Sequence, residues 1–70
     1  MKYNVGDIVE VTMELEYTAV PLRYKVRVKE VHEEDEAYTV AEIDKQGNES
    51  WLYGEIYDED DNHVLYKGIT

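Results

Sequence analysis

The sequence predicts an all-β protein, in which five short strands curl into a small barrel. Three observations support this fold class. Apolar and charged residues alternate along 9–17 and again along 22–28, as they do in strands with one buried face. No segment sustains a helical period. The connections are short and polar, and a curled sheet is how such short strands cover their own apolar face.

The first two strands are predicted to form a hairpin within 8–30, about a turn at 18–21 that contains Pro21. Their apolar residues pair as Tyr17–Leu22, Leu15–Tyr24, Met13–Val26 and Val11–Val28. The same register pairs the charged rows as Glu16–Arg23, Glu14–Lys25, Thr12–Arg27 and Glu10–Lys29. Because a slip of one residue would set apolar side chains against charged ones, we expect this register to be strongly specified.

The remaining elements follow in chain order. Gly6 and Asp7 turn the backbone into the first strand, and a β-bulge near Lys29 explains why the alternation of the second strand shifts by one residue. An acidic turn is predicted at 33–36, a third strand at 37–44 and a hairpin turn at 45–48, where Gly47 supplies a positive φ. A fourth strand at 49–53, a tight helical turn at 54–57, a polar connection at 58–62 and a final strand at 63–67 complete the chain.

The predicted helical turn favours one barrel type over another. An OB-fold usually carries a helix between its third and fourth strands, where this chain has only a hairpin turn. A Src-homology-3-like (SH3-like) barrel has a single helical turn before the last strand, which is where 54–57 falls. We therefore predict one SH3-like domain over residues 1–70.

A resemblance points the same way. The opening 3–11 contains the pattern V-G-D-x-V-x-V, and it is followed by an acidic turn, a Tyr-x-Val strand, a Gly turn, Trp51-Leu52-Tyr53 and an acidic segment ending in Glu59-Asp60. This order resembles small SH3-like proteins of unknown function from bacteriophages and prophages of Gram-positive bacteria. The resemblance implies a fold and an origin in a mobile element. It transfers no activity and no site residue.

Composition excludes several classes of function. With 7 basic and 17 acidic residues the formal net charge is -10, and four of the basic residues lie on the strand 23–29. Direct binding to nucleic acid or to anionic lipid is disfavoured, because both need a basic surface. The chain has no Cys, no signal-like apolar segment and no membrane-length apolar run, so we expect a cytoplasmic protein.

Candidates for catalysis and metal binding are few. The segment 58–62 offers oxygen ligands but lacks the spacing of a calcium-binding loop, so we interpret it as a solvated acidic loop. His32 and His63 lie in or beside acidic segments and are interpreted as surface histidines. No nucleophile motif accompanies them. We expect neither an enzyme, nor a metal site, nor a cofactor.

The aromatic residues provide the candidate binding surface. The chain has one Trp, seven Tyr and no Phe, and Tyr and Trp are favoured at interfaces. Trp51 and Tyr53 are predicted to share one strand face with Tyr57 just beyond, and the predicted site adds the flanking acids Asp58, Glu59, Asp60 and Asp61. The alternative is that these rings fill the core, and for Trp51 the dominance of large aromatics in small cores favours that alternative.

These observations predict a small, acidic, non-catalytic protein–protein interaction module that is a monomer or a weak dimer. The alternative is an inhibitor whose carboxylates imitate the phosphates of nucleic acid and occupy a DNA- or RNA-binding protein. The basic row 23–29 is interpreted as the structural partner of the acidic row 10–16, which leaves it unavailable for nucleic acid.

Overall fold

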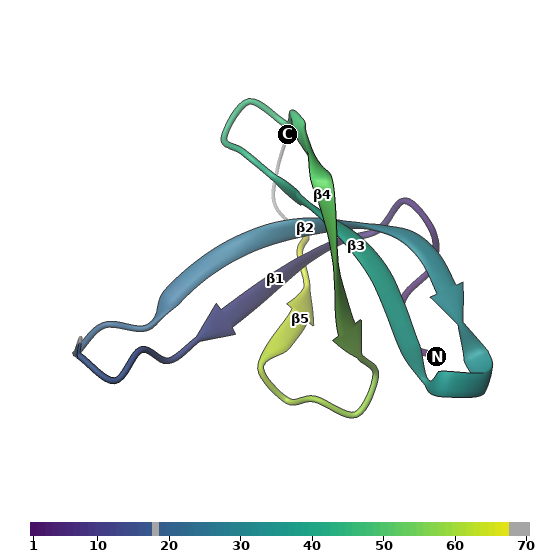
Figure 1. The fold of residues 1–70 in the computed structure, drawn as a ribbon, viewed down its shortest axis with the longest axis horizontal. Coiled ribbons are helices and arrows are strands. Elements are labelled where there is room, and N and C mark those ends of the chain that lie inside the picture. The colour runs from purple at the N-terminus through teal and green to yellow at the C-terminus, as the bar shows by residue number, and fades with distance from the viewer. Residues whose placement is uncertain (18, 68–70) are drawn as a thin grey trace.

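The computed structural model describes residues 1–17 and 19–67 and confirms an all-β fold of five antiparallel strands (Figure 1). The strands are β1 (Ile8–Met13), β2 (Leu22–His32), β3 (Ala37–Ile43), β4 (Glu49–Tyr57) and β5 (His63–Leu65). They form one sheet in the order β4-β3-β2-β1-β5, and within the described residues this sheet is not closed by pairing of β4 with β5. Two predicted features fall partly outside the description: the turn at 18–21 at Thr18, and the predicted domain at 68–70.

The predicted register of the first hairpin is wrong by four residues. In the structure Val9 lies opposite Val26, Val11 opposite Tyr24 and Met13 opposite Leu22. The two-residue period forbids an odd slip but allows an even one, because an even shift keeps every side chain on its own face. The sequence pattern therefore assigned the faces correctly for Val9 and Val11 while leaving the partner of each residue open.

The N-terminal segment explains why the observed register is favoured. Gly6, at φ 95°, donates its N–H to the carbonyl of Val28 at 2.8 Å, and Val28 donates back to Asp7 at 2.9 Å. This continues the β1–β2 ladder toward the N-terminus and brings Tyr3 into the core, where only 4% of it is exposed. Burying this large ring is a gain that the predicted register would forgo.

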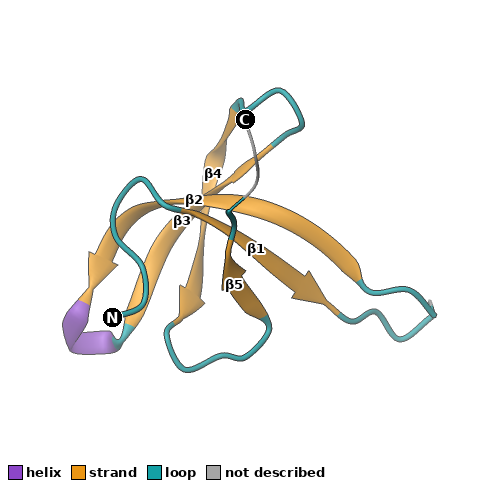
Figure 2. Ribbon diagram, turned by 180° about the vertical axis from the view of Figure 1, so that it is seen from behind, coloured by secondary structure: helices purple, strands orange, loops and turns teal. Residues whose placement is uncertain are grey.

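With the observed register, the connection between β1 and β2 is long and exposed, and we call it the arm. Residues 14–17 and 19–21 connect β1 to β2 outside any strand, and the connection projects beyond the rest of the sheet in Figures 1 and 2. Met13, Leu15 and Leu22 are about half exposed, and Tyr17 is 94% exposed. The prediction that these residues belong to the buried row is wrong.

The pairings of β3 with β2 and with β4 test the predicted bulge and the predicted helical turn. A register shift between Val28 and Glu30 confirms the predicted bulge. β4, however, runs unbroken to Tyr57, and Ile56 lies opposite Tyr38 in the core. The predicted helical turn at 54–57 is therefore wrong. The extended backbone is favoured there because it places the Ile56 side chain in the core. The 3₁₀ turn of the described chain is η1 (Glu33–Asp35), between β2 and β3.

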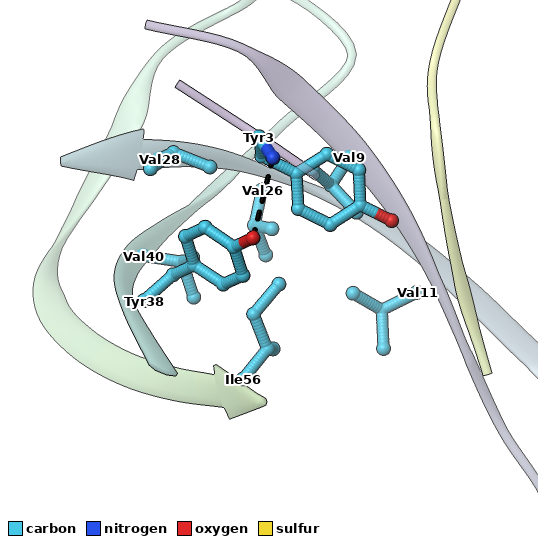
Figure 3. Packing of buried hydrophobic residues seen from close by; sticks show 8 residues of the cluster. All are labelled: Tyr3, Val9, Val11, Val26, Val28, Tyr38, Val40 and Ile56. Atoms are coloured by element: carbon cyan, nitrogen blue, oxygen red, sulfur yellow. Dashed lines mark hydrogen bonds between the residues drawn. The ribbon is translucent and has the colours of Figure 1, made fainter. Parts of the chain in front are cut away.

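The core lies inside the curl of the sheet (Figure 3). Every strand except β5 contributes to it, together with Tyr3 from the N-terminal segment, and the rings of Tyr3 and Tyr38 lie 5.2 Å apart, centroid to centroid. The buried set is Tyr3, Val9, Val11, Val26, Val28, Tyr38, Val40 and Ile56. With five valines among eight residues, this core depends on its two tyrosines for volume.

The predicted charge pairs along the hairpin are replaced by different ones. The Glu49 carboxylate, at the start of β4, forms ion pairs with Arg27 (Nη1 to Oε1, 3.0 Å) and with Lys29 (Nζ to Oε2, 2.9 Å). Both cations belong to β2 and reach Glu49 on the far side of β3, and Arg27 lies opposite Ala41 of β3, which is fully buried. A small residue at this position of β3 lets side chains from the strands on either side meet.

Candidate interaction surface

The most exposed aromatic residue of the described strands lies on the edge strand β4. Trp51 is 85% exposed, so the interpretation of this residue as a core ring is wrong. Its neighbours Leu52 and Tyr53 are 63% and 60% exposed. Within the described residues, β4 pairs with β3 on one side only. Three consecutive exposed apolar side chains therefore belong to an edge strand, whose outer edge pairs with no other strand among the described residues.

The ladder of β4 is irregular at this point. Tyr53 lies opposite Ala41 and Glu49 opposite Ile43, with a register shift between the two pairs. Three residues, 50–52, thus face one residue of β3, and the backbone N–H of Leu52 donates to the Ser50 hydroxyl at 3.1 Å. Such bulges re-aim side chains and limit indiscriminate edge pairing.

A hollow of about 240 Å³ adjoins the same strand on the inner side of the sheet. Its walls come from the middle strands β2 and β3 and from β4, and include Tyr24, Val40, Leu52 and Ile56. Two carboxylates, Glu42 and Glu55, stand at its margin. Apolar side chains and two carboxylates share the lining of the hollow, which suits an apolar side chain whose neighbours are basic.

Tyr57 lies at the far end of β4, opposite Ala37, and is 49% exposed. A hydrogen bond with the Glu55 side chain raises the pKa of the Tyr57 hydroxyl. Its carbonyl accepts a hydrogen bond from His63 Nε2 at 2.6 Å. The structure therefore places Tyr57 on β4 itself rather than in a turn beyond it, four residues along the strand from Tyr53.

The acidic segment 58–61 divides into structural and exposed residues. Asp58 accepts hydrogen bonds from the backbone N–H of Lys2 at 3.0 Å and from the Tyr38 hydroxyl. These two bonds, the backbone bond first, lower the pKa of the Asp58 carboxyl. Glu59 and Asp60 are exposed, as is Asp61. Asp58 therefore holds the N-terminal segment in place, a role that no sequence pattern indicated.

Folding brings a second acidic segment beside the first. Asp58 donates its N–H to the carbonyl of Glu36 at 2.8 Å, so the turn 33–36 adjoins the loop 58–61. A hydrogen bond between the Glu36 and Glu59 side chains raises the pKa of Glu36, and the negative charge of Glu59 adds to the shift. We call residues 33–36 and 58–61 together the acidic end.

His63 corrects another sequence interpretation, because it is 4% exposed rather than a surface residue. Its Nε2 faces the Tyr57 carbonyl, which can only accept, so Nε2 carries the hydrogen. Nδ1 lies within hydrogen-bond distance of the Tyr3 hydroxyl, at 2.8 Å. Through this imidazole the end of β4 is joined to the start of β5, the two edges of the sheet. Burial raises the pKa of Tyr3.

His32, the other histidine, is partly buried on β2, with Nε2 2.7 Å from the Thr39 hydroxyl. Among residues 1–17 and 19–67, no group of three or more His, Asp and Glu side chains is arranged to hold a metal ion. Within the same residues, no helix is long and apolar enough to cross a membrane.

Compared with family models, with curated proteins and with solved structures, the chain gives no match. The resemblance to phage and prophage proteins therefore stays a prediction, and function must be argued from the surface just described.

Proposed function

We propose that this protein is a small, acidic, non-catalytic protein–protein interaction module that uses the free side of β4. The observation that carries the proposal is the exposure of Trp51, Leu52 and Tyr53 in sequence on an edge strand. Trp and Tyr are the residues that most often dominate binding energy at interfaces. An isolated exposed Leu is ordinary on a protein surface, but a Trp-Leu-Tyr run is a concentrated apolar patch.

Strand addition is the binding mode that suits this edge. An extended segment of a partner pairs its backbone with β4, and its alternate side chains reach the surfaces on either side of the sheet. The hollow beside Leu52 accepts an apolar side chain. Glu42 and Glu55 at its margin, and the acidic end beyond Tyr57, favour a partner segment with Lys or Arg beside its apolar residues.

The finer fold assignment belongs to this proposal. We infer that the sheet is of the SH3-like barrel type, in which peptide-binding grooves are common. What supports this is the curled five-stranded meander with β5 beside β1, and the His63 bridge between the edge strands. The position of the 3₁₀ turn between β2 and β3 departs from that pattern.

The test is affinity capture of partners from nuclease-treated lysate of the source organism, at low and at high salt. The variant Trp51→Ser/Tyr53→Ser should lose the partner, and that partner should be retained by wild type at high salt, because apolar contacts are not screened. Tyr17→Ser is the matched control, since Tyr17 is at least as exposed but lies on the arm between β1 and β2. Equal capture by wild type and by the double variant would contradict the proposed surface.

A second candidate function rests on the acidic end. Two segments that are far apart in sequence place their carboxylates side by side, and the Glu36 and Glu59 side chains meet there. A dense array of negative charge on a small rigid domain suits a protein that occupies the basic cleft of a nucleic-acid-binding protein. In the same capture experiment this function requires a basic partner that is lost at high salt and lost with Glu59→Gln/Asp60→Asn/Asp61→Asn. Asp58 is left unchanged because it is structural.

A further inference from the structure

On the outer face of the sheet, at the end of β3 where Ile43 lies, a hollow of about 490 Å³ brings together three basic side chains. Arg23 and Lys25 come from β2, and Lys45 comes from the turn after β3. Three of the seven basic residues of a strongly acidic chain thus line one concave surface. The sequence indicated only a basic row along one strand and did not indicate that Lys45 joins it.

The observed register sets one carboxylate, Glu10, opposite Lys25 on the neighbouring strand β1, but it forms no ion pair with that lysine. Among the described residues, no carboxylate lies within ion-pair distance of Arg23, Lys25 or Lys45, and the ion pairs that exist involve Arg27, Lys29 and His32. The predicted pairing of Lys25 with Glu14 does not occur, because Glu14 lies beyond the end of β1. The observed register therefore leaves Arg23 and Lys25, at the start of β2, without an ion pair among the described residues, whereas Arg27 and Lys29 are paired with Glu49.

The one acidic residue that lines the hollow, Asp44, accepts hydrogen bonds from the backbone of the adjacent turn. Asp44 accepts the N–H groups of Gln46 and Asn48, each at 2.9 Å. The backbone hydrogen bond from Asn48 lowers the pKa of Asp44, so this carboxylate stays ionised at neutral pH. Its one negative charge against three positive charges leaves the lining with an excess of two positive charges.

The walls of the hollow are apolar and aromatic. Ile8 and Ile43 are partly buried there, and Lys25 Nζ stands 3.9 Å from the centroid of the Tyr66 ring. This cation–π contact orders the ammonium group over an aromatic surface. A ligand with both a negative group and a flat apolar body would find a partner for each part.

The acidic end lies far from this hollow, whereas two single carboxylates lie nearer, Glu10 opposite Lys25 and Glu49 opposite Ile43. The acidic end adjoins the first residue of β3, Ala37, and the hollow adjoins the last, Ile43. Six residue steps of a strand span roughly 20 Å. The Debye length at physiological ionic strength is about 8 Å, so the acidic end is largely screened from the hollow.

We propose that this hollow binds a phosphate monoester on a small aromatic or aliphatic body. A dianion matches the excess of positive charge better than a monocarboxylate does, and the Arg23 guanidinium offers the fork geometry that phosphate oxygens accept in pairs. The volume falls in the range of small-molecule sites. The site lies apart from the free side of β4 and is a function beyond that of an interaction module.

The test is a titration of the full chain, followed by backbone amide NMR shifts, with phenyl phosphate, inorganic phosphate and benzoate as separate probes. Phenyl phosphate should shift amides around 23–25, 43–45 and 66, and should bind about tenfold more tightly than either other probe, since inorganic phosphate lacks the apolar body and benzoate carries a single negative charge. Shifts spread evenly over the surface, or equal binding of benzoate, would overturn the proposal.

Two matched variants remove one positive charge each from the same strand. Lys25→Gln should weaken phenyl phosphate about tenfold, as the loss of one charge-assisted contact does. Lys29→Gln removes an equal charge at a residue that is bound to Glu49 and lies outside the hollow, and should leave the affinity within about twofold. Equal weakening by both variants would show a response to overall charge alone and would overturn the assigned site.

Discussion

The two ends of β3 hold carboxylates in opposite surroundings. At one end, Glu49 receives hydrogen bonds from Lys29 and Arg27, and the bond from Lys29 is the main reason that its pKa is lowered. At the other end, Glu36 meets the carboxyl group of Glu59, and its pKa is raised. Both carboxylates belong to the same chain of net charge -10, so overall charge does not explain the difference between them. The comparison teaches that local partners, selected by the register of the strands, decide whether an acid stabilises this fold or strains it.

The largest expected effect concerns the residue that holds the acidic end to the core. Tyr38→Phe removes a hydroxyl that donates to Asp58 and accepts the N–H of Tyr3 at 3.2 Å. Because both partners lose a hydrogen bond at a buried site, we expect the free energy of unfolding to fall by about 1–3 kcal/mol. Urea denaturation measures this, and Tyr53→Phe, at an exposed ring, should change it by no more than about 0.5 kcal/mol. Equal effects of the two variants would show that the network has no structural role.

Glu49→Gln is expected to have a smaller effect at the other end of β3. It removes the charge that Arg27 and Lys29 share, so the urea midpoint at neutral pH should fall. Glu16→Gln makes the same change in net charge on the exposed arm and should leave the midpoint nearly unchanged. An increase in the midpoint for Glu49→Gln would mean that relief of the net negative charge outweighs both ion pairs.

Glu36→Gln should act in the opposite direction. It removes one of two like charges that meet at the acidic end, and its amide can still donate a hydrogen bond to Glu59. We expect a small rise in the urea midpoint at neutral pH, larger than the rise produced by Glu34→Gln in the same turn. A fall in the midpoint would show that the Glu36 carboxylate has a stabilising partner.

The smallest effect is a difference in pH dependence. Glu49 has a lowered folded-state pKa, so its stabilisation is present above its ordinary value of 4.5 and is lost as the pH falls through the folded pKa. Glu36 has a raised folded-state pKa, so its contribution is favourable below 4.5 and is lost as the pH rises through the folded pKa. Urea midpoints measured from acid to neutral pH should rise less steeply in Glu49→Gln and more steeply in Glu36→Gln than in wild type. Identical slopes in the three proteins would contradict the two assigned environments.

The candidate surface could be predicted from the sequence only in part. Aromatic enrichment around Trp51 and Tyr53 pointed to a strand whose rings the structure shows to be exposed at the edge of the sheet. Whether those rings face water depends on which strand ends as an edge, and that is a property of the strand order. The same limit explains His63: its position beside acids indicated a surface residue, and its burial depends on Tyr3 and Tyr57, each supplied by a distant part of the chain.

The sequence by itself determined the all-β class, the inward faces of Val9, Val11, Val26 and Val28, the bulge near Lys29 and the turn at Gly47. Each of these is local, because period-two burial and positive φ are properties of neighbouring residues. Tertiary structure alone decided the four-residue shift of the first hairpin, the unbroken course of β4 through Gly54, and the joining of two acidic segments by the bond between Asp58 and Glu36. An alternating pattern is unchanged by an even shift, so only the burial of Tyr3 against Tyr38 could distinguish one register from the next.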